Sequence, residues 1–413
     1  MTIMQNNHMP ITYWRAWKGK KIANNLLRGS PKLSFPNLPA YLYMGRKMNP
    51  GTITHLEVDE ESKFKYVFIA YATCIKGFRC MRKIIVVDGT WLKSRYKGVI
   101  LIAMAQDGNF HQYPIAWGVV DSENDASWSW FLTKLHHLIP DESEWVLISD
   151  RHQSIINWLS NIYKKSQHGH CRWHLSQNIK ANVRVKGVIK LFDETANAHK
   201  VSEFNQLYDE LKNRYPRVVN YLEESNVPLS KWARSHFTGC RYNIMTTNGA
   251  EFINAVMKQP REYSIIALLE AMQAKVSKWF NNRRKVVAVG FYNIIRKRFK
   301  KALEMNVKQL NRFEYEIIAT YEQTRIEIYD LCSNYYKLET WALAYVDTIY
   351  LVPQLKDWDI DEVELLPKVF PPNVPIKCGR RKRIKSHLLE MAKNGLKGVG
   401  YVESLVTPRR HAP

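Results

Sequence analysis

The segment KIIVVDGTW (83–91), with GVILIAMAQ (98–106) and QYPIAWGVV (112–120) after it, decides the fold class of this chain. All three stretches are rich in β-branched and other apolar residues, and turn-forming sequence such as Asp107-Gly108-Asn109 separates them. Runs of this kind between turn signals predict strands, here at 83–87, 98–106 and 112–120. We expect these three strands to form an antiparallel meander.

The sequence after the meander alternates between helical and strand patterns. Apolar residues at helical spacing from Trp128 to Ile139 predict a helix, which a polar cap region at Asn124 precedes. A strand is expected at 145–149, then a helix carrying Ile155 and a short segment that ends in HGHCRWH (168–174). The order βββαβαβ predicts an α/β fold with a mixed sheet and helical cover.

Five regions can be distinguished along the sequence. Residues 81–175 form the first part of the α/β core, and residues 241–305 complete it. The stretch 176–240 shows no strand alternation, so it is predicted to be an all-helical insertion between the two parts. Residues 1–80 are predicted to be an N-terminal arm of short helices and loops, and residues 306–413 a C-terminal helical region with a basic tail.

Charge and composition restrict the function classes. The 413 residues include 61 lysines and arginines against 38 acidic residues, and the net charge of +23 favours a polyanionic partner. No apolar stretch reaches the roughly 20 residues that cross a bilayer, and the N-terminal sequence lacks a secretory pattern, so no membrane association is expected. Six cysteines without a CxxC pair fit a reducing compartment, the cytosol or the nucleus. Neither a Walker loop nor a GxSxG motif is present, so nucleotide hydrolysis and serine esterase chemistry have no support from motifs.

Two aspartates stand where predicted strands end. Asp88 directly follows IIVV, and Asp150 directly follows VLIS. Functional groups of open α/β sheets gather at the carboxyl edge of the strands. If the two strands are neighbours, the carboxylates converge and a divalent cation would neutralise their repulsion, so the pair is a candidate Mg²⁺ site. The alternative is that each aspartate merely starts a turn.

Glu251, in TTNGAEFINAVM (246–257), is a candidate third metal ligand. A helix is expected to begin near Thr247, and Asn248 would be its N-cap. A glutamate three residues after the cap also completes a capping box. From the residues alone, both interpretations stay open.

His168, Cys171 and His174 form the pattern H-x-x-C-x-x-H. Histidine and cysteine at this spacing can bind zinc, but no clear fourth ligand lies nearby in the sequence. The alternative is that these side chains pack and form hydrogen bonds beside the carboxyl edge.

Basic stretches are candidate contacts for DNA. Residues 283–285 and 296–301 lie in an amphipathic segment that runs from Ile265 to about Met305, and residues 379–385 lie in the tail. Clustered Lys and Arg neutralise phosphates, although a solvated helix face has the same pattern. The tail tract also resembles a nuclear-localisation or minor-groove sequence. The candidate DNA-binding residues are Arg283, Arg284, Lys285, Arg380, Arg381, Lys382 and Arg383.

Seven motifs occur in an order and spacing that resembles plant Mutator-like element (MULE) transposases, over roughly residues 10–385. They are VDGTWLKSRYKG (87–98), AQDGN (105–109), YPIAWGVVDSENDASWSWFL (113–132), LISDRHQSI (147–155), HCRWHLSQN (170–178), WARSHF (232–237) and TTNGAEFINAV (246–256).

This resemblance implies a ribonuclease-H-like, retroviral-integrase-like core with a DDE triad that a helical insertion interrupts. On this sequence the triad falls on Asp88, Asp150 and Glu251, while Cys171 and His174 match the family's C-x-x-H motif. The resemblance further implies Mg²⁺ or Mn²⁺ as cofactor, with zinc at the C-x-x-H motif less well supported. The implied reaction is DNA strand cleavage and strand transfer, with transposon ends and target DNA as partners, a nuclear location and assembly as a homo-oligomer.

Some family features are missing from this sequence. Neither the amino-terminal zinc module nor the SWIM finger, C-x-C…C-x-H, is found, and the tail motif Gly379-Arg380-Arg381 lacks the proline of an AT-hook. We therefore expect a Mutator-like transposase or a truncated relative of one. One alternative is a non-catalytic DNA-binding or transcription-regulating protein derived from a transposase, similar to the far-red-response transcription factors of plants. Another is an inactive remnant that folds but binds neither metal nor DNA strongly.

Overall fold

A computed structural model of the chain describes residues 12–183, 187–225, 227–240, 244–246, 255–288, 306–309, 315–318, 333–353, 357–358 and 366–373. The chain divides into two compact units, Met1–Asn373 and Val374–Pro413, and every described residue belongs to the first unit. No described helix is both long and apolar enough to cross a membrane.

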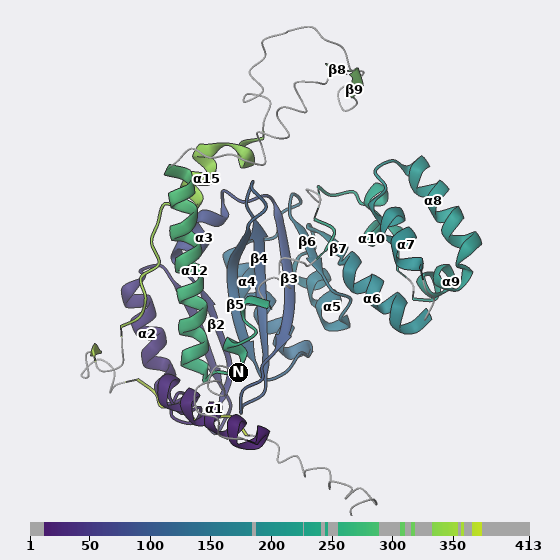
Figure 1. Cartoon of the computed structure of the whole chain (residues 1–413). Helices are drawn as coiled ribbons and strands as arrows, with labels where there is room; N and C mark the ends of the chain where they lie inside the picture. The colour runs from purple at the N-terminus through teal and green to yellow at the C-terminus, as the bar shows by residue number, and fades with distance from the viewer. Residues whose placement is uncertain are drawn as a thin grey trace, which may run out of the picture. The chain divides into compact units, whose positions relative to one another are not determined.

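The secondary structure combines helices and strands, labelled as in Figure 1. The helices are α1 (Tyr13–Arg28), α2 (Leu38–Met48), α3 (Ala72–Phe78), α4 (Asp125–Leu138), α5 (Gln153–Ile162), α6 (Arg172–Val183), α7 (Val188–Asn197), α8 (Val201–Arg214), α9 (Pro216–Glu224), α10 (Leu229–Trp232), α12 (Ile265–Ala288) and α15 (Leu338–Ala344). The strands are β1 (Ile53–Val58), β2 (Phe64–Ala70), β3 (Ile84–Trp91), β4 (Val99–Gln106), β5 (Gln112–Val120), β6 (Val146–Ser149), β7 (Gln167–His170), β8 (Asn306–Gln309) and β9 (Tyr315–Ile318).

Seven strands form one mixed sheet in the order β1-β2-β5-β4-β3-β6-β7. The pairs β1–β2, β2–β5, β5–β4 and β4–β3 are antiparallel. Strand β6 is parallel to β3, and β7 is parallel to β6. Parallel pairing requires a crossover connection, and the helices α4 and α5 provide it. The prediction of a mixed sheet with a three-stranded meander is therefore confirmed.

Helix α4 forms where the sequence predicts a helix, and it begins at the expected polar cap. The Asn124 side chain accepts a hydrogen bond from the Ser127 backbone N–H, and the Ser127 hydroxyl accepts one from the Asn124 backbone N–H, which together make a capping box. Behind this cap, Trp128, Phe131 and Leu135 are fully buried against the sheet.

The prediction of helices and loops for residues 1–80 is wrong for 53–70, which form the hairpin β1–β2. Strand β2 reads FKYVFIA, a sequence of aromatic and β-branched residues typical of strands. It pairs with β5, which follows much later in the chain. The N-terminal region thus extends the sheet instead of standing apart as an arm.

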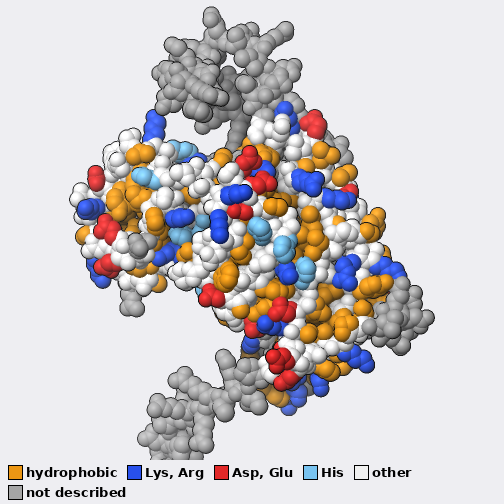
Figure 2. All heavy atoms as spheres, turned by 180° about the vertical axis from the view of Figure 1, so that it is seen from behind, with side chains coloured by type: hydrophobic (Ala, Val, Ile, Leu, Met, Phe, Trp, Pro, Cys, Tyr) orange, Lys and Arg blue, Asp and Glu red, His pale blue; other side chains and the backbone are white. Residues whose placement is uncertain are grey.

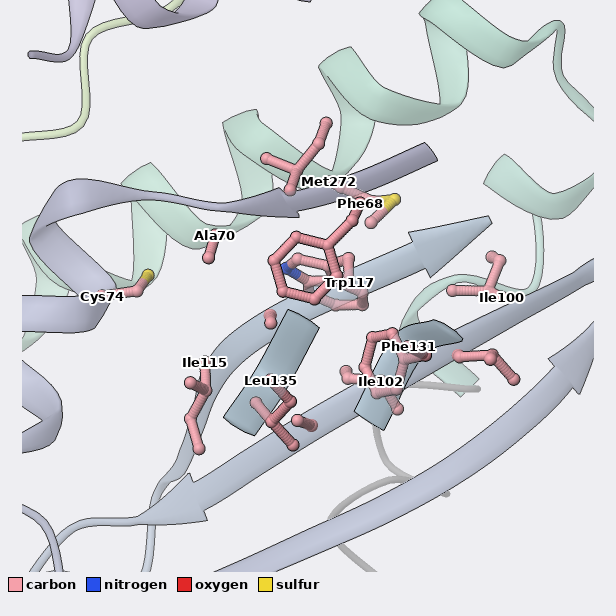
Figure 3. Close-up of a cluster of buried hydrophobic side chains, with 14 of the residues drawn as sticks. Phe68, Ala70, Cys74, Ile100, Ile102, Ile115, Trp117, Phe131, Leu135 and Met272 are labelled. Carbon is pink, nitrogen blue, oxygen red and sulfur yellow. The ribbon is translucent and has the colours of Figure 1, made fainter. Parts of the chain in front are cut away.

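Helices cover both faces of the sheet. On one face α4 approaches so closely that a Cβ atom on Gly118 of β5 would lie 2.8 Å from Phe131. Phe68, which is paired with Gly118, also contacts the Phe131 ring, with 5.6 Å between centroids. On the other face α12 contributes Met272 to the same cluster (Figure 3). Buried side chains on both faces explain why β4 and β5 are almost continuously apolar.

The region predicted to be a helical insertion is helical where the structure describes it. Helices α6 to α10 follow β7, and they bury a hydrophobic cluster that is separate from the core of the sheet. Trp232 of α10 is at the centre of it, stacked on Phe192 with ring centroids 5.2 Å apart and tilted against Phe204 at 5.8 Å. This region therefore has its own core.

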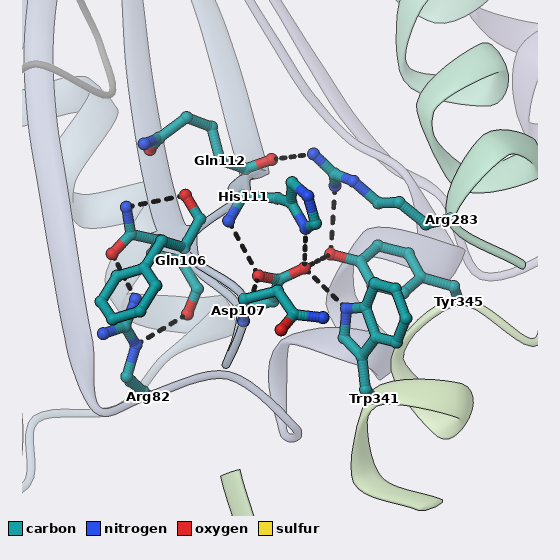
Figure 4. Close-up of polar contacts among 10 residues, drawn as sticks. Arg82, Gln106, Asp107, His111, Gln112, Arg283, Trp341 and Tyr345 are labelled. Carbon is teal, nitrogen blue, oxygen red and sulfur yellow. Dashed lines mark hydrogen bonds and ion pairs between the residues drawn. The ribbon is translucent and has the colours of Figure 1, made fainter. Parts of the chain in front are cut away.

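A buried carboxylate ties the segment around α15 to the turn between β4 and β5. Asp107 is completely buried and accepts hydrogen bonds from the Trp341 indole N–H at 2.7 Å and the Tyr345 hydroxyl at 2.8 Å (Figure 4). Burial alone would raise the pKa of Asp107, but the hydrogen bond and charge of His111 and the nearby Arg283 outweigh it and hold the pKa below its usual value. The ionised carboxylate thus joins two segments that are far apart in sequence.

Candidate functional site

Asp88 and Asp150 lie at neighbouring positions on the parallel pair β3 and β6. The last paired residues of this register are Val86 and Ile148, and two further residues along each strand lead to Asp88 and Asp150. Adjacent strands are about 4.8 Å apart, so the two backbones are close at this level. The sequence prediction that the two aspartates meet at one edge is supported by this register.

Asp88 differs from the prediction in one respect, because it lies inside a strand and not after it. Strand β3 continues to Trp91, since Asp88, Gly89 and Thr90 pair with Ile102, Leu101 and Ile100 of β4. Only 5% of the Asp88 side chain is exposed. Turn formation therefore does not explain this aspartate.

The pKa of Asp88 is raised to about 7. Burial is the main cause, because it penalises the charged form, and the negative charges of Asp150 and Glu123 add to it. The charge of His174 and the hydrogen bond from the Gly89 backbone N–H act in the opposite direction. The carboxylate is thus held where its negative charge is poorly compensated by the protein.

Glu123 is a third acidic residue of the site, which the sequence reasoning missed. It lies between β5 and α4 and accepts a hydrogen bond from the Trp128 indole N–H at 3.3 Å. A Cβ atom on Gly89 would be 3.1 Å from the Glu123 Oε1 atom, so the carboxylate lies against the backbone beside Asp88. Burial raises the pKa of Glu123, and so does the charge of Asp150.

A topological signal in the sequence could have found Glu123. In a three-stranded meander the first and third strands point the same way, so β3 and β5 end at the same edge of the sheet. Glu123 follows the end of β5 by three residues. It therefore belongs to the same edge as the carboxyl end of β3.

The C-x-x-H residues are next to the carboxylates. Cys171 lies between β7 and α6 and is fully buried, and His174 lies in the first turn of α6. Burial lowers the pKa of His174, but its hydrogen bond with Cys171 and the charges of Cys171, Asp88 and Asp150 outweigh this effect and raise it to about 9. His168 lies on β7, where its Nε2 atom is 2.8 Å from the hydroxyl of Ser149 on β6. The His174 imidazole therefore faces the acidic pair, while His168 contacts β6.

The third acid of the expected triad, Glu251, lies outside the described residues, and so do its expected helix near Thr247 and the basic stretches 296–301 and 379–385. In the part of the chain that the structure describes, no group of three or more His, Cys, Asp or Glu side chains is arranged to hold a metal ion. The described candidates for Mg²⁺ ligands are therefore Asp88 and Asp150, while Cys171 and His174 are the described candidates for zinc.

The expectation that Arg283 contacts DNA requires a correction. Only 9% of this residue is exposed, and its guanidinium donates hydrogen bonds to the Tyr345 hydroxyl at 3.1 Å and the Gln112 carbonyl at 2.8 Å. Figure 4 shows that it approaches the buried Asp107 cluster. Its position on α12 makes it part of the packing of α15, so a solvated or DNA-binding face is the wrong interpretation for this residue.

The other two basic residues of this stretch lie nearer to solvent. Arg284 is half-buried and donates to the Thr348 hydroxyl at 2.6 Å, and Lys285 is exposed. On the face of the molecule in Figure 2, Lys and Arg side chains are spread among acidic ones and form no single basic patch. A path for DNA is thus not evident from the surface charge of this face.

The fold and this site together define a mixed α/β protein with carboxylates gathered at the carboxyl edge of two adjacent parallel strands. Residues 84–178 match the family model of the MULE transposase domain. The matched segment runs from β3 into α6 and includes Asp88, Glu123, Asp150, Cys171 and His174. The match supports a Mutator-like transposase family and a transposase-related function. No curated protein matches the chain.

Proposed function

We propose that the chain is a Mutator-like DDE transposase, or a truncated relative of one, that cleaves DNA strands and joins them to a target. The observation that carries this proposal is the position of Asp88 level with Asp150, in a segment that matches the MULE transposase domain. Two carboxylates on adjacent parallel strands give a rigid acidic pair, because the strand backbones fix their separation. A nuclear location and a plant origin are part of the same proposal.

The topology supports a ribonuclease-H-like core. Its five strands would be β3, β4 and β5 as an antiparallel meander, followed by β6 and β7 in parallel on the other side of β3. Strands β1 and β2 extend the sheet beyond β5. In this arrangement β3 is the central strand. Asp88 lies in the middle of β3, and Asp150 directly follows the parallel strand β6.

The residues at this edge fit a hard divalent cation. Asp88 and Asp150 would hold Mg²⁺ or Mn²⁺, and Glu251 is proposed as the third ligand. When bound, two such ions would activate the attacking hydroxyl and stabilise the attacking and leaving oxygens of a phosphodiester displacement. The donor set is the observation behind this fit, because Asp88 is buried beside Asp150 and Glu123, and a cation would compensate the charges of these carboxylates.

The protein's own residues would prepare this edge. Asp88 and Asp150 present oxygen ligands on backbones that the β3–β6 pairing holds in register. Glu123 adds negative charge beside them, while the raised pKa of His174 keeps a positive charge near the pair at neutral pH. The exposed side chains around the edge would contact the DNA backbone.

Calorimetric titration with Mn²⁺ tests the metal site without knowledge of the DNA ends. We expect binding by the wild-type chain, and loss of binding in Asp88→Asn and Asp150→Asn. Asp59→Asn is a matched control, because Asp59 lies in the β1–β2 turn, where its Oδ1 atom accepts backbone hydrogen bonds that Asn can also accept. Glu251→Gln examines the third ligand. Strand cleavage at the wild-type rate in Asp88→Asn or Asp150→Asn would remove that residue from the mechanism.

The second candidate is a non-catalytic DNA-binding derivative, which the net charge of +23 fits without a metal site. Absence of Mn²⁺ binding in the wild-type chain, together with DNA binding that weakens steeply with salt, would select this candidate over the transposase.

A further inference from the structure

A cavity of about 570 Å³ lies between the edge of the sheet and the helical insertion. One wall comes from β6, β7, α5 and the residues that flank them, and the other from Ser225, Val227, Pro228 and Lys231, which lie after α9 and in α10. Contacts between α10 and β7 hold the two walls together. A cavity of this size is in the range of sites that bind small molecules or single monomer units of a polymer.

The charged residues of the lining are all basic. Arg151, Lys164 and Lys231 line the cavity, and they come from both walls. None of the described lining residues is an Asp or a Glu. A cavity that basic residues line from two sides, with no acidic residue among its described lining, suits an anionic ligand.

The remainder of the lining includes a substantial apolar surface. Leu147, Ile156 and Leu159 line the cavity from the β6–α5 side, together with Tyr163. The Tyr163 hydroxyl donates to the Ile139 carbonyl at 3.2 Å, so its polar end is already satisfied within the core. A ligand that fits this lining has an anionic end and a flat or apolar body.

The cavity extends to the carboxyl edge of the strands where the proposed metal site lies. Arg151 directly follows Asp150, and His170 is the last residue of β7. His168, another lining residue, contacts Ser149 at the end of β6. A strand of DNA at the carboxylates would thus have this cavity within reach of its next phosphates.

We propose that this cavity binds one phosphate-bearing nucleotide of a DNA strand, with the phosphate near Lys231 and Arg151 and the base against the apolar wall. The proposal rests on the proposed function, since it assumes that DNA is the substrate. It gives the helical insertion a role, because Ser225, Val227, Pro228 and Lys231 supply one wall of the subsite. A free nucleotide also carries a phosphate and a base, so the experiment distinguishes a nucleotide of a DNA strand from a free nucleotide.

Binding is measured by fluorescence anisotropy of a labelled single-stranded DNA of about twelve nucleotides, with EDTA present so that the result is independent of the metal site. Lys231→Gln removes a cation from the cavity. Ser160→Trp fills it from α5 without a change of charge, since Ser160 is an exposed lining residue. Matched controls are Lys190→Gln, whose side chain is 85% exposed on α7, and Ser202→Trp, at an exposed position on α8.

We expect each cavity variant to bind the oligonucleotide about tenfold more weakly than its control. Equal affinities for each variant and its control would overturn the proposal. The proposal would also be overturned by a free nucleoside monophosphate that binds as tightly as the oligonucleotide and does not displace the oligonucleotide. The cavity would then bind a free nucleotide and not a nucleotide of a DNA strand. The binding assay contains EDTA, so its result does not depend on the metal site or on strand cleavage. A chain that binds the oligonucleotide through the cavity but cleaves no strand would count only against the proposed function.

Discussion

Asp88 lies level with Asp150 across the parallel strands β3 and β6, two residues beyond the paired positions Val86 and Ile148. The consequence is electrostatic. Burial and the neighbouring carboxylates raise the pKa of Asp88 to about 7, so the folded chain without metal does not favour the ionised form. A site of this kind sacrifices stability for the ability to bind a cation.

The first prediction concerns the stability of Asp88→Asn without metal. The folded state retains a proton on Asp88 up to about pH 7, whereas the unfolded chain releases it near its usual value of 3.8. The free energy of unfolding of the wild type therefore falls as the pH rises between these values. Asparagine carries no charge and can still accept from the Gly89 N–H, so the variant should be more stable at about pH 8, by up to about 4 kcal/mol.

Urea unfolding in EDTA at about pH 5 and about pH 8 measures this effect. At the lower pH, Asp88 of the folded wild type is protonated, so the advantage of the variant should shrink. Asp59→Asn, in an exposed turn, should show no such pH dependence. A variant that is less stable than the wild type at the higher pH would contradict the account of Asp88 as a poorly compensated buried carboxylate.

The second prediction concerns the pH dependence of metal binding. A proton and a metal ion compete for Asp88, so the affinity for Mn²⁺ should increase as the pH rises and level off above about pH 7. Below this value the increase should approach tenfold per pH unit for a single proton released. Calorimetry at a series of pH values measures it, and an affinity that is constant from about pH 5 to about pH 8 would exclude Asp88 as the ligand that titrates.

The third prediction concerns Glu123. Its charge contributes to the raised pKa of Asp88, so Glu123→Gln should lower that pKa and move the pH midpoint of Mn²⁺ binding downward. Glutamine can still accept from the Trp128 indole N–H, which preserves the packing of α4. A mere structural role of Glu123 would change the melting temperature and leave the midpoint in place. Asp125→Asn, at the exposed start of α4, is the nearby control.

The sheet could be predicted from sequence mainly where the pairing is local. The meander β3–β4–β5 and helix α4 have turn and cap signals of their own, and these were confirmed. The hairpin β1–β2 was missed, although FKYVFIA is typical of a strand, because its place in the sheet depends on pairing with β5. Pairing over long stretches of sequence leaves no local signal.

The same distinction between local sequence signals and long-range pairing applies to the candidate site. Asp88 and Asp150 could be found because apolar strands precede them, but Glu123 comes from a connection and reaches the site only through the fold. Arg283 illustrates the converse. In sequence it belongs to a basic run, yet α12 turns it toward Tyr345 and Gln112, because a helix presents neighbouring residues on different faces.

The fourth prediction concerns the buried carboxylate that holds the segment around α15. Asp107 accepts from Trp341 and Tyr345 and is completely buried, so Asp107→Asn replaces an ionised acceptor by a neutral amide that accepts these hydrogen bonds more weakly. We expect the free energy of unfolding at about pH 7 to fall by about 3 kcal/mol. Because the pKa of Asp107 is lowered, its contribution is present above its usual value and is lost only as the pH falls through the lower value in the folded state.

The location of this effect distinguishes it from a general loss of stability. Hydrogen exchange should increase first in residues 338–345, which Asp107 anchors, while the amides of β3 and β6 stay protected. Arg283→Gln should act on the same segment, because it removes the donor to the Tyr345 hydroxyl, and it should leave the salt dependence of DNA binding unchanged. A decrease in the salt slope by about one phosphate contact in Arg283→Gln would instead restore this arginine to the DNA-binding surface.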